Sequence, residues 1–171
     1  LPEHIKFTFN GSDRLSESNL HIFPIDHYEA LSEATSTQIV DLKKLLTNRT
    51  AQISSPIPLY PTAYTIDEFL LQPSYVNFDG GYGVGFFAAV SDDPETLLVY
   101  AFQGLTDNGL NFVTTVIPLR GELLDQVLTS DESETLTQVS DRHSLLEAEL
   151  AEIREDLNGA LNSLSIPQSI A

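Results

Sequence analysis

Residues 75–119 read YVNFDGGYGVGFFAAVSDDPETLLVYAFQGLTDNGLNFVTTVIPL, and this stretch decides the fold. Turn-forming residues divide it into apolar runs of strand length. The turns lie at 79–81, 91–94 and 107–109, and the runs lie at 75–78, 84–90, 97–103 and 110–117. The stretch therefore predicts an antiparallel meander of four consecutive strands.

Upstream of the meander, the pattern predicts two more strands and a helix. Ile5, Phe7 and Phe9 alternate with polar residues, which is typical of a half-buried strand, and residues 19–23 form a second apolar run. Apolar residues at helical spacing predict a helix over about 35–47. Prolines at 56, 58 and 61 predict an extended connector, and a short helix is expected at 66–71.

The C-terminal region carries the most regular pattern in the chain. Apolar residues recur alternately three and four positions apart, with one histidine among them. The positions are Leu136, Val139, His143, Leu146, Leu150, Ile153, Leu157, Ala160 and Leu164. This seam predicts a helix of about 25 to 30 residues, capped near Asp131. Because acidic residues crowd the helix, we expect the seam to be covered by the sheet or by a partner.

Together these elements predict an α+β fold in one domain, residues 1–171. We expect an antiparallel β-meander sheet of four to six strands, packed on one face by helices and completed by the long C-terminal helix. The expected parts are N-terminal strands (1–25), a helix and proline-rich connector (26–72), the meander (73–119) and a helical C-terminal region (120–171).

Composition excludes several classes of function. The chain of 171 residues has a formal net charge of −17, so a nucleic-acid backbone or an anionic lipid surface would be repelled. No run of about 18 apolar residues exists that could span a membrane. The absence of cysteine excludes disulfides, thiolate nucleophiles and sulfur-ligated metal sites. The chain has no methionine and begins at Leu1, so we expect that a signal peptide or lipoprotein leader was removed upstream.

The meander resembles a segment of uncharacterised secreted or lipid-anchored bacterial proteins. Their pattern runs roughly Y-L-x-F-x-N-G-x-G-V-R-F-L-T-x-Y, followed by L-x-Y-x-F-Q-G-L-T-x-D-G-x-Y-Y-V. Here residues 75–87 read YVNFDGGYGVGFF and residues 98–113 read LVYAFQGLTDNGLNFV. The chain departs from the pattern at Gly85, where the family has arginine, and at residues 107–109, where the family's Asp-Gly becomes Asp-Asn-Gly. The resemblance implies export and a similar fold, and it implies no activity.

The residues that carry this resemblance are expected to be structural. They are Gly80, Gly83, Val84, Phe102, Gln103, Gly104, Leu105, Thr106, Asp107 and Gly109. The glycine run at 80–85 precedes a strand instead of a helix, so it predicts a hairpin or bulge and not a phosphate-binding loop. Gln103, Thr106 and Asp107 have a second interpretation, in which the strand end presents them to a ligand.

The sequence offers no catalytic, cofactor-binding or metal-binding set. The four histidines lack zinc spacing, and Asp92 with Asp93, or Asp107 with Asn108, lack the calcium-loop pattern. His21 is expected to face solvent, and His143 lies within the seam. The acidic pairs Asp67/Glu68 and Asp131/Glu132 fall where acids cap helices and solvate turns.

These observations leave three hypotheses open. The leading one is a non-enzymatic interaction or structural domain of an exported bacterial protein, extracellular or in the cell envelope, with a protein partner. The second is a homo-oligomer that assembles through the C-terminal seam, and the third is a hydrolase of envelope or sugar substrates.

Overall fold

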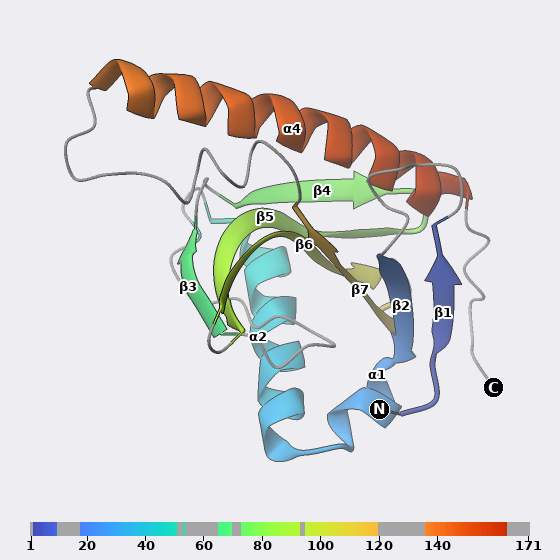
Figure 1. Cartoon of the computed structure of the whole chain (residues 1–171). Coiled ribbons are helices and arrows are strands. Elements are labelled where there is room, and N and C mark those ends of the chain that lie inside the picture. The colour runs from blue at the N-terminus through green and yellow to red at the C-terminus, as the bar shows by residue number, and fades with distance from the viewer. Residues whose placement is uncertain are drawn as a thin grey trace.

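The computed structural model of the chain describes residues 2–9, 18–50, 53, 65–69, 73–92, 95–119 and 136–163. For residues 65–69, 91, 92, 95–97 and 136–143 it describes the backbone alone. Within these ranges the chain forms seven strands and three helices (Figure 1).

The seven strands form one antiparallel sheet. They are β1 (Ile5–Thr8), β2 (Asn19–Pro24), β3 (Thr65–Phe69), β4 (Ser74–Phe78), β5 (Gly81–Asp92), β6 (Glu95–Thr106) and β7 (Asn111–Pro118). Their order is β1-β2-β7-β6-β5-β3, and β4 pairs with β5 beside β3. The predicted meander is confirmed as β4 to β7.

The helices are α1 (Ile25–Glu29), α2 (Glu33–Asn48) and α4 (Leu136–Ser163). Ser32 starts α2, because its hydroxyl accepts a hydrogen bond from Thr35 N while the Thr35 hydroxyl accepts one from Ser32 N. The predicted helix over 35–47 is confirmed, with two extra residues at its start. The long C-terminal helix is also confirmed, at 28 residues, whereas the cap at Asp131 lies outside the described residues.

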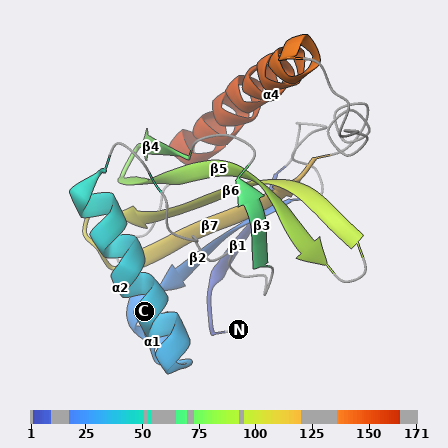
Figure 2. The ribbon, with the colours of Figure 1, turned by 90° about the vertical axis from the view of Figure 1, so that its left-hand side faces the viewer.

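Helices cover both faces of the sheet, where the sequence led us to expect one. Figures 1 and 2 show α4 crossing one face and α2, with the short α1, lying against the other. The physical reason lies in β5 and β6, whose apolar residues run consecutively and thus point to both faces in turn. Val84, Phe86 and Ala88 face α2, while Phe87 faces α4.

One predicted element is wrong. Residues 65–69 form β3, not part of a helix at 66–71. β3 pairs with the second half of β5, where Ile66 lies opposite Val90 and Phe69 lies opposite Ala88. β3 is a strand because its backbone pairs with β5, whose residues lie about twenty positions downstream. The local sequence of residues 65–69 therefore did not reveal this pairing.

The seam of α4 is covered by the chain's own sheet. Leu146, Leu150, Ile153, Leu157 and Leu161 are buried in one cluster with strand residues such as Phe87 and Phe102. Between residues 146 and 161, where the structure describes these side chains, the buried leucines and isoleucine are therefore occupied within a single chain. The side chain of His143 lies outside the described residues, as does Leu164.

Candidate functional site

The structure gathers the residues of the family-like pattern at one end of the sheet. β5 begins there and β6 ends there, so that Gly83 lies opposite Gly104 and Val84 lies opposite Gln103. Asp107 N donates a hydrogen bond of 2.9 Å to Gly80 O, which closes this end. Two segments about 20 residues apart in sequence thus form one local unit.

Ring-over-glycine packing holds this unit together on the α4 face. The Phe102 ring lies so close to Gly83 and Gly104 that a Cβ at either position would overlap it. Gly85 is covered in the same way by the Tyr100 side chain. Phe102 and Tyr100 are fully buried, and at Gly83 and Gly104 a backbone oxygen of the neighbouring strand also lies close, so close packing explains these glycines without a bound phosphate.

Two further glycines of the pattern set the turns. Gly80 has φ of 85° and Gly109 has φ of 68°, a region that side-chain-bearing residues rarely adopt. Between them the turn of 107–110 is fixed by Asn108, whose Oδ1 accepts from Thr106 Oγ1 at 2.7 Å and from Leu110 N at 3.0 Å. The Asn108 side-chain oxygen is engaged in these two hydrogen bonds of the turn, which argues against a calcium site with Asp107.

Gln103, Thr106 and Asp107 do not converge on one point. Gln103 is 3% exposed and, by strand alternation, points to the α2 face, whereas Thr106 points to the opposite face. The Thr106 hydroxyl also accepts a hydrogen bond of 3.1 Å from Asn111 N. Asp107 is exposed in the turn. Their geometry favours the structural interpretation over shared contact with one ligand.

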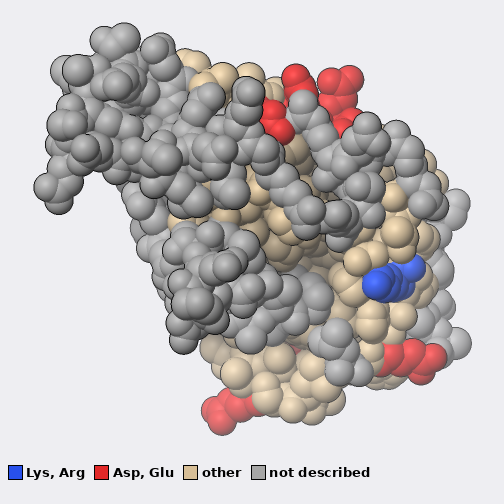
Figure 3. Space-filling view, viewed as in Figure 1, with Lys and Arg blue, Asp and Glu red and all other residues tan. Residues whose placement is uncertain are grey.

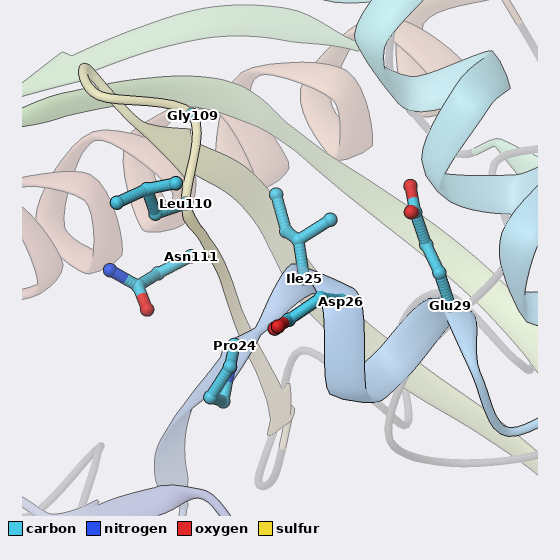
Figure 4. Close-up of a pocket in the computed structure, with 7 residues that line it drawn as sticks. All are labelled: Pro24, Ile25, Asp26, Glu29, Gly109, Leu110 and Asn111. Atoms are coloured by element: carbon cyan, nitrogen blue, oxygen red, sulfur yellow. The ribbon is translucent and has the colours of Figure 1, made fainter. Parts of the chain in front are cut away.

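Beside this turn lies an open hollow of about 290 Å³. We call it the Leu110 hollow; it is lined by Pro24, Ile25, Asp26, Glu29, Gly109, Leu110 and Asn111 (Figure 4). One wall is the β6–β7 turn and the other is the junction of β2 with α1. Ile25 N donates to Leu110 O at 2.9 Å and ties the two walls together. Leu110 is 53% exposed, the largest exposed fraction among the large hydrophobic side chains that the structure describes.

The hollow combines acidic and amide groups with this apolar side chain. Glu29 forms an ion pair of 3.1 Å with Lys43 of α2, whereas Asp26 accepts a hydrogen bond of 2.9 Å from His27 N. Figure 4 shows the Asp26 carboxylate and the Asn111 amide on either side of Pro24. Asn111 is 1% exposed, and its Nδ2 has no hydrogen-bond partner among the described residues.

Sequence reasoning did not find the Leu110 hollow. Its walls come from residues 24–29 and 109–111, which are about 80 positions apart and share no motif. The one available signal was a leucine directly after the turn residues Asn108 and Gly109, where a polar residue is expected.

A second polar group is buried between α4 and the sheet. Burial raises the pKa of the Tyr100 hydroxyl above its usual value, and the neighbouring Arg154 guanidinium opposes that rise. Although the two side chains interact, Tyr100 Oη and Arg154 Nε have no hydrogen-bond partner among the described residues, and neither has Asn158 Oδ1. These groups contribute polarity to the interface of α4 with the sheet.

Two histidines and two tyrosines pack against neighbouring rings or a cation. His21 is half-buried instead of facing solvent, because its ring stacks at 5.9 Å from Phe23 and 5.0 Å from His4. Tyr75 and Tyr82 flank the Arg49 guanidinium at 5.7 and 5.9 Å. In the described part of the chain, no three His, Asp or Glu side chains come together in a way that could hold a metal ion.

Several predicted candidates fall outside what the structure describes. They include the side chains of Asp67, Glu68 and Asp92, and all of Asp93, Asp131 and Glu132. Of the described helices, none has the length and apolar character needed to span a bilayer. Compared with protein families, curated proteins and solved structures, the chain has no significant match.

Proposed function

We propose that this chain is a non-enzymatic interaction domain of an exported bacterial protein, and that the Leu110 hollow is its partner-binding surface. The observation that carries the proposal is an exposed leucine on a rigid turn, next to a hollow lined by two carboxylates. An apolar side chain with polar groups around it matches the apolar core and polar rim of protein interfaces.

The rigidity of the turn supports this role. The backbone on both sides of Leu110 is held by hydrogen bonds from Leu110 N to Asn108 Oδ1 and from Ile25 N to Leu110 O. A surface that is already ordered loses little conformational entropy when a partner binds. The turn therefore presents the leucine in one position.

Charge supports a basic partner. The chain carries 25 acidic against 8 basic residues, and on the face shown in Figure 3 the described acidic side chains lie at the periphery. A strongly acidic protein accelerates its encounter with cationic partners. We infer that the partner segment places a leucine-sized apolar residue against Leu110 and a lysine or arginine against Asp26.

A peptide-array binding experiment tests the surface. We expect peptides that combine lysine or arginine with large apolar residues to bind the chain, and acidic peptides of the same length not to bind. Leu110→Ser and Asp26→Asn should each weaken binding about tenfold. The matched controls are Leu31→Ser, a leucine 48% exposed elsewhere, and Asp41→Asn, an exposed acid of α2; neither should change the affinity.

Equal losses of affinity in the test and control variants would show that binding is non-specific. Chemical conversion of a bound peptide would contradict the non-enzymatic assignment.

Export is a separate part of the proposal and rests on the resemblance of residues 75–113. Expressing the full-length gene in a bacterium and fractionating the cells tests it, since recovery of the chain from the cytoplasm alone would refute it.

A further inference from the structure

The N-terminal strand β1 is the most lightly held element of the described sheet. It forms one edge and pairs only with β2, in the register Ile5 with Ile22, Lys6 with His21, Phe7 with Leu20 and Thr8 with Asn19. None of its four residues is fully buried, in contrast to Leu20 and Ile22 of β2. Edge strands of this length contribute little stability by themselves.

On the face that carries α1 and α2, β1 is attached through two histidines. The His4 ring stacks at 4.7 Å from Phe23 and lies 5.0 Å from the His21 ring. Lys6 is exposed and lies directly opposite His21 in the sheet. Three side chains that carry positive charge in acid therefore meet at the pairing of β1 with β2.

The surroundings of His21 favour its neutral form. Burial is the largest effect that lowers the pKa of His21 below the usual value of 6.5, followed by repulsion from His4 and from Lys6. The groups that face this stack from β7 and α1 are Thr114, opposite His21, and Phe112 and Tyr28 against Phe23. None of them carries a charge in this pH range. His21 Nδ1 is buried with no hydrogen-bond partner, so a proton placed there has no acceptor among the described residues.

The sign of the pH effect follows from this lowered pKa. Below pH 6.5 the released state, in which His21 regains its ordinary pKa, binds more protons than the paired state. Pairing of β1 is therefore fully stable above that pH and weakens as the pH falls toward the lowered pKa. The charge of −17 on the whole chain favours protonation of histidine generally, but salt at about 0.15 M screens charges beyond about 8 Å.

On the opposite face, β1 fills shallow apolar positions that another strand could take. Ile5 and Phe7 are half-buried and pack on the cluster that contains Leu20 and Ile22. A strand that pairs with the edge of β2 therefore places apolar side chains at the positions of Ile5 and Phe7 and a polar side chain at the position of Lys6 between them. An extended segment can add to such an edge through main-chain hydrogen bonds, with side-chain positions supplying specificity.

We propose that β1 is a releasable edge strand. In mildly acidic solution, protonation of His21 between His4 and Lys6 frees it from β2. The uncovered edge of β2 then binds an extended partner segment with apolar side chains in the places of Ile5 and Phe7 and a carboxylate in the place of Lys6. A carboxylate fits because it lies opposite a protonated His21, where Lys6 is repelled. This inference concerns a different surface from the Leu110 hollow and does not depend on it.

Hydrogen exchange of the whole chain at pH 7.5 and 5.5 in 0.15 M salt tests the release. After correction for intrinsic exchange rates, we expect amide protection of Ile5–Thr8 to fall severalfold at pH 5.5, up to the limit of about tenfold that one histidine can contribute, while β5 and β6 keep theirs. Lys6→Gln should move the transition to lower pH, and His21→Gln should abolish it. His27→Gln, at an exposed histidine of α1, should leave it unchanged.

Protection of β1 that does not depend on pH would overturn the release, and so would a loss that is equal across the sheet or that persists in His21→Gln. If His21→Gln does not fold, Lys6→Gln and His27→Gln still decide the question, because the first must shift the transition and the second must not.

Binding of a labelled peptide, followed by fluorescence anisotropy, tests the occupant. The probe has the sequence of residues 3–9 with Lys6→Glu, and its controls are the unchanged segment and a scrambled version. We expect the Lys6→Glu peptide to bind at pH 5.5 at least tenfold more tightly than either control, and weakly at pH 7.5. Equal binding of all three peptides, or none at pH 5.5, would refute the proposed partner chemistry.

Discussion

The two faces of the sheet are buried by different means. On the α4 face, the outer ends of the Tyr100 and Phe102 side chains lie over glycines of β5 and β6. On the α2 face, strand side chains such as Val84 and Phe86 stand out from the sheet and contact side chains of α2, among them Ile39. One face thus buries aromatic rings against backbone, and the other packs side chains between two elements.

This difference shows in the glycines of β5 and β6, which all lie on one side. A Cβ at Gly81, Gly83, Gly85 or Gly104 would meet an aromatic ring of the α4 face. The same face buries unpaired polar atoms of Tyr100, Arg154 and Asn158. The α4 face is therefore shaped by close approach and tolerates little change in side-chain volume.

The largest expected effect compares one ring from each face. Phe102→Ala removes the ring that covers Gly83 and Gly104 and should cost about 4–5 kcal/mol, near the top of the range for buried phenylalanine. Phe86→Ala on the α2 face should cost about 3 kcal/mol, because helix side chains there can move into the space. Urea unfolding measures both variants, and equal costs would show that covering glycine adds nothing.

A smaller effect is expected when a methyl group is added under a ring. Gly85→Ala should destabilise the chain by about 1–3 kcal/mol, because its Cβ overlaps the Tyr100 hydroxyl. Tyr100→Phe alone should cost about 0.5–1 kcal/mol, because the buried hydroxyl that it removes interacts with the Arg154 guanidinium.

In the double variant, Tyr100→Phe should restore about 1 kcal/mol of the loss, which a double-mutant cycle measures. Gly159→Ala is the control at an exposed position of α4 with no atom nearby, and should stabilise the helix by about 0.5–1 kcal/mol. Additive effects of Gly85→Ala and Tyr100→Phe would contradict the proposed overlap.

The smallest expected effect concerns the link between α2 and the sheet. Arg49 follows α2 with φ of 42°, bonds Asn77 Oδ1 at 2.9 Å and lies against the rings of Tyr75 and Tyr82. Arg49→Ala should cost about 1 kcal/mol, from the lost contacts of an exposed cation. Arg49→Gly loses the same contacts, but glycine adopts a positive φ without strain. Its melting temperature in thermal unfolding should therefore be higher than that of Arg49→Ala.

Sequence reasoning succeeded where turn chemistry and periodicity act locally. The strands of the meander follow from Gly80, the prolyl turn at 94 and Gly109, and α4 follows from leucines three and four residues apart. The C-terminal seam was correctly expected to need a cover. Its cover proved to be the sheet, since Leu150 and Ile153 are buried within the chain.

It failed where distant segments meet. The helix expected at 66–71 is β3, because the free edge of β5 outweighs local preference. The consecutive apolar residues of β5 and β6 indicated burial on both faces, and that signal was missed when helices were placed on one face. His21 was expected to face solvent by alternation alone, yet His4 and Phe23 cover it.

The sequence by itself determined the strands of the meander, the acidic surface and the long amphipathic helix, because each depends on residue types that act within a few positions. Only the tertiary structure decided which rings lie over which glycines, which face α4 covers, and that residues 24–29 and 109–111 enclose a hollow. These features depend on pairings between segments up to 80 residues apart, for which short-range propensities and periodicities carry no information.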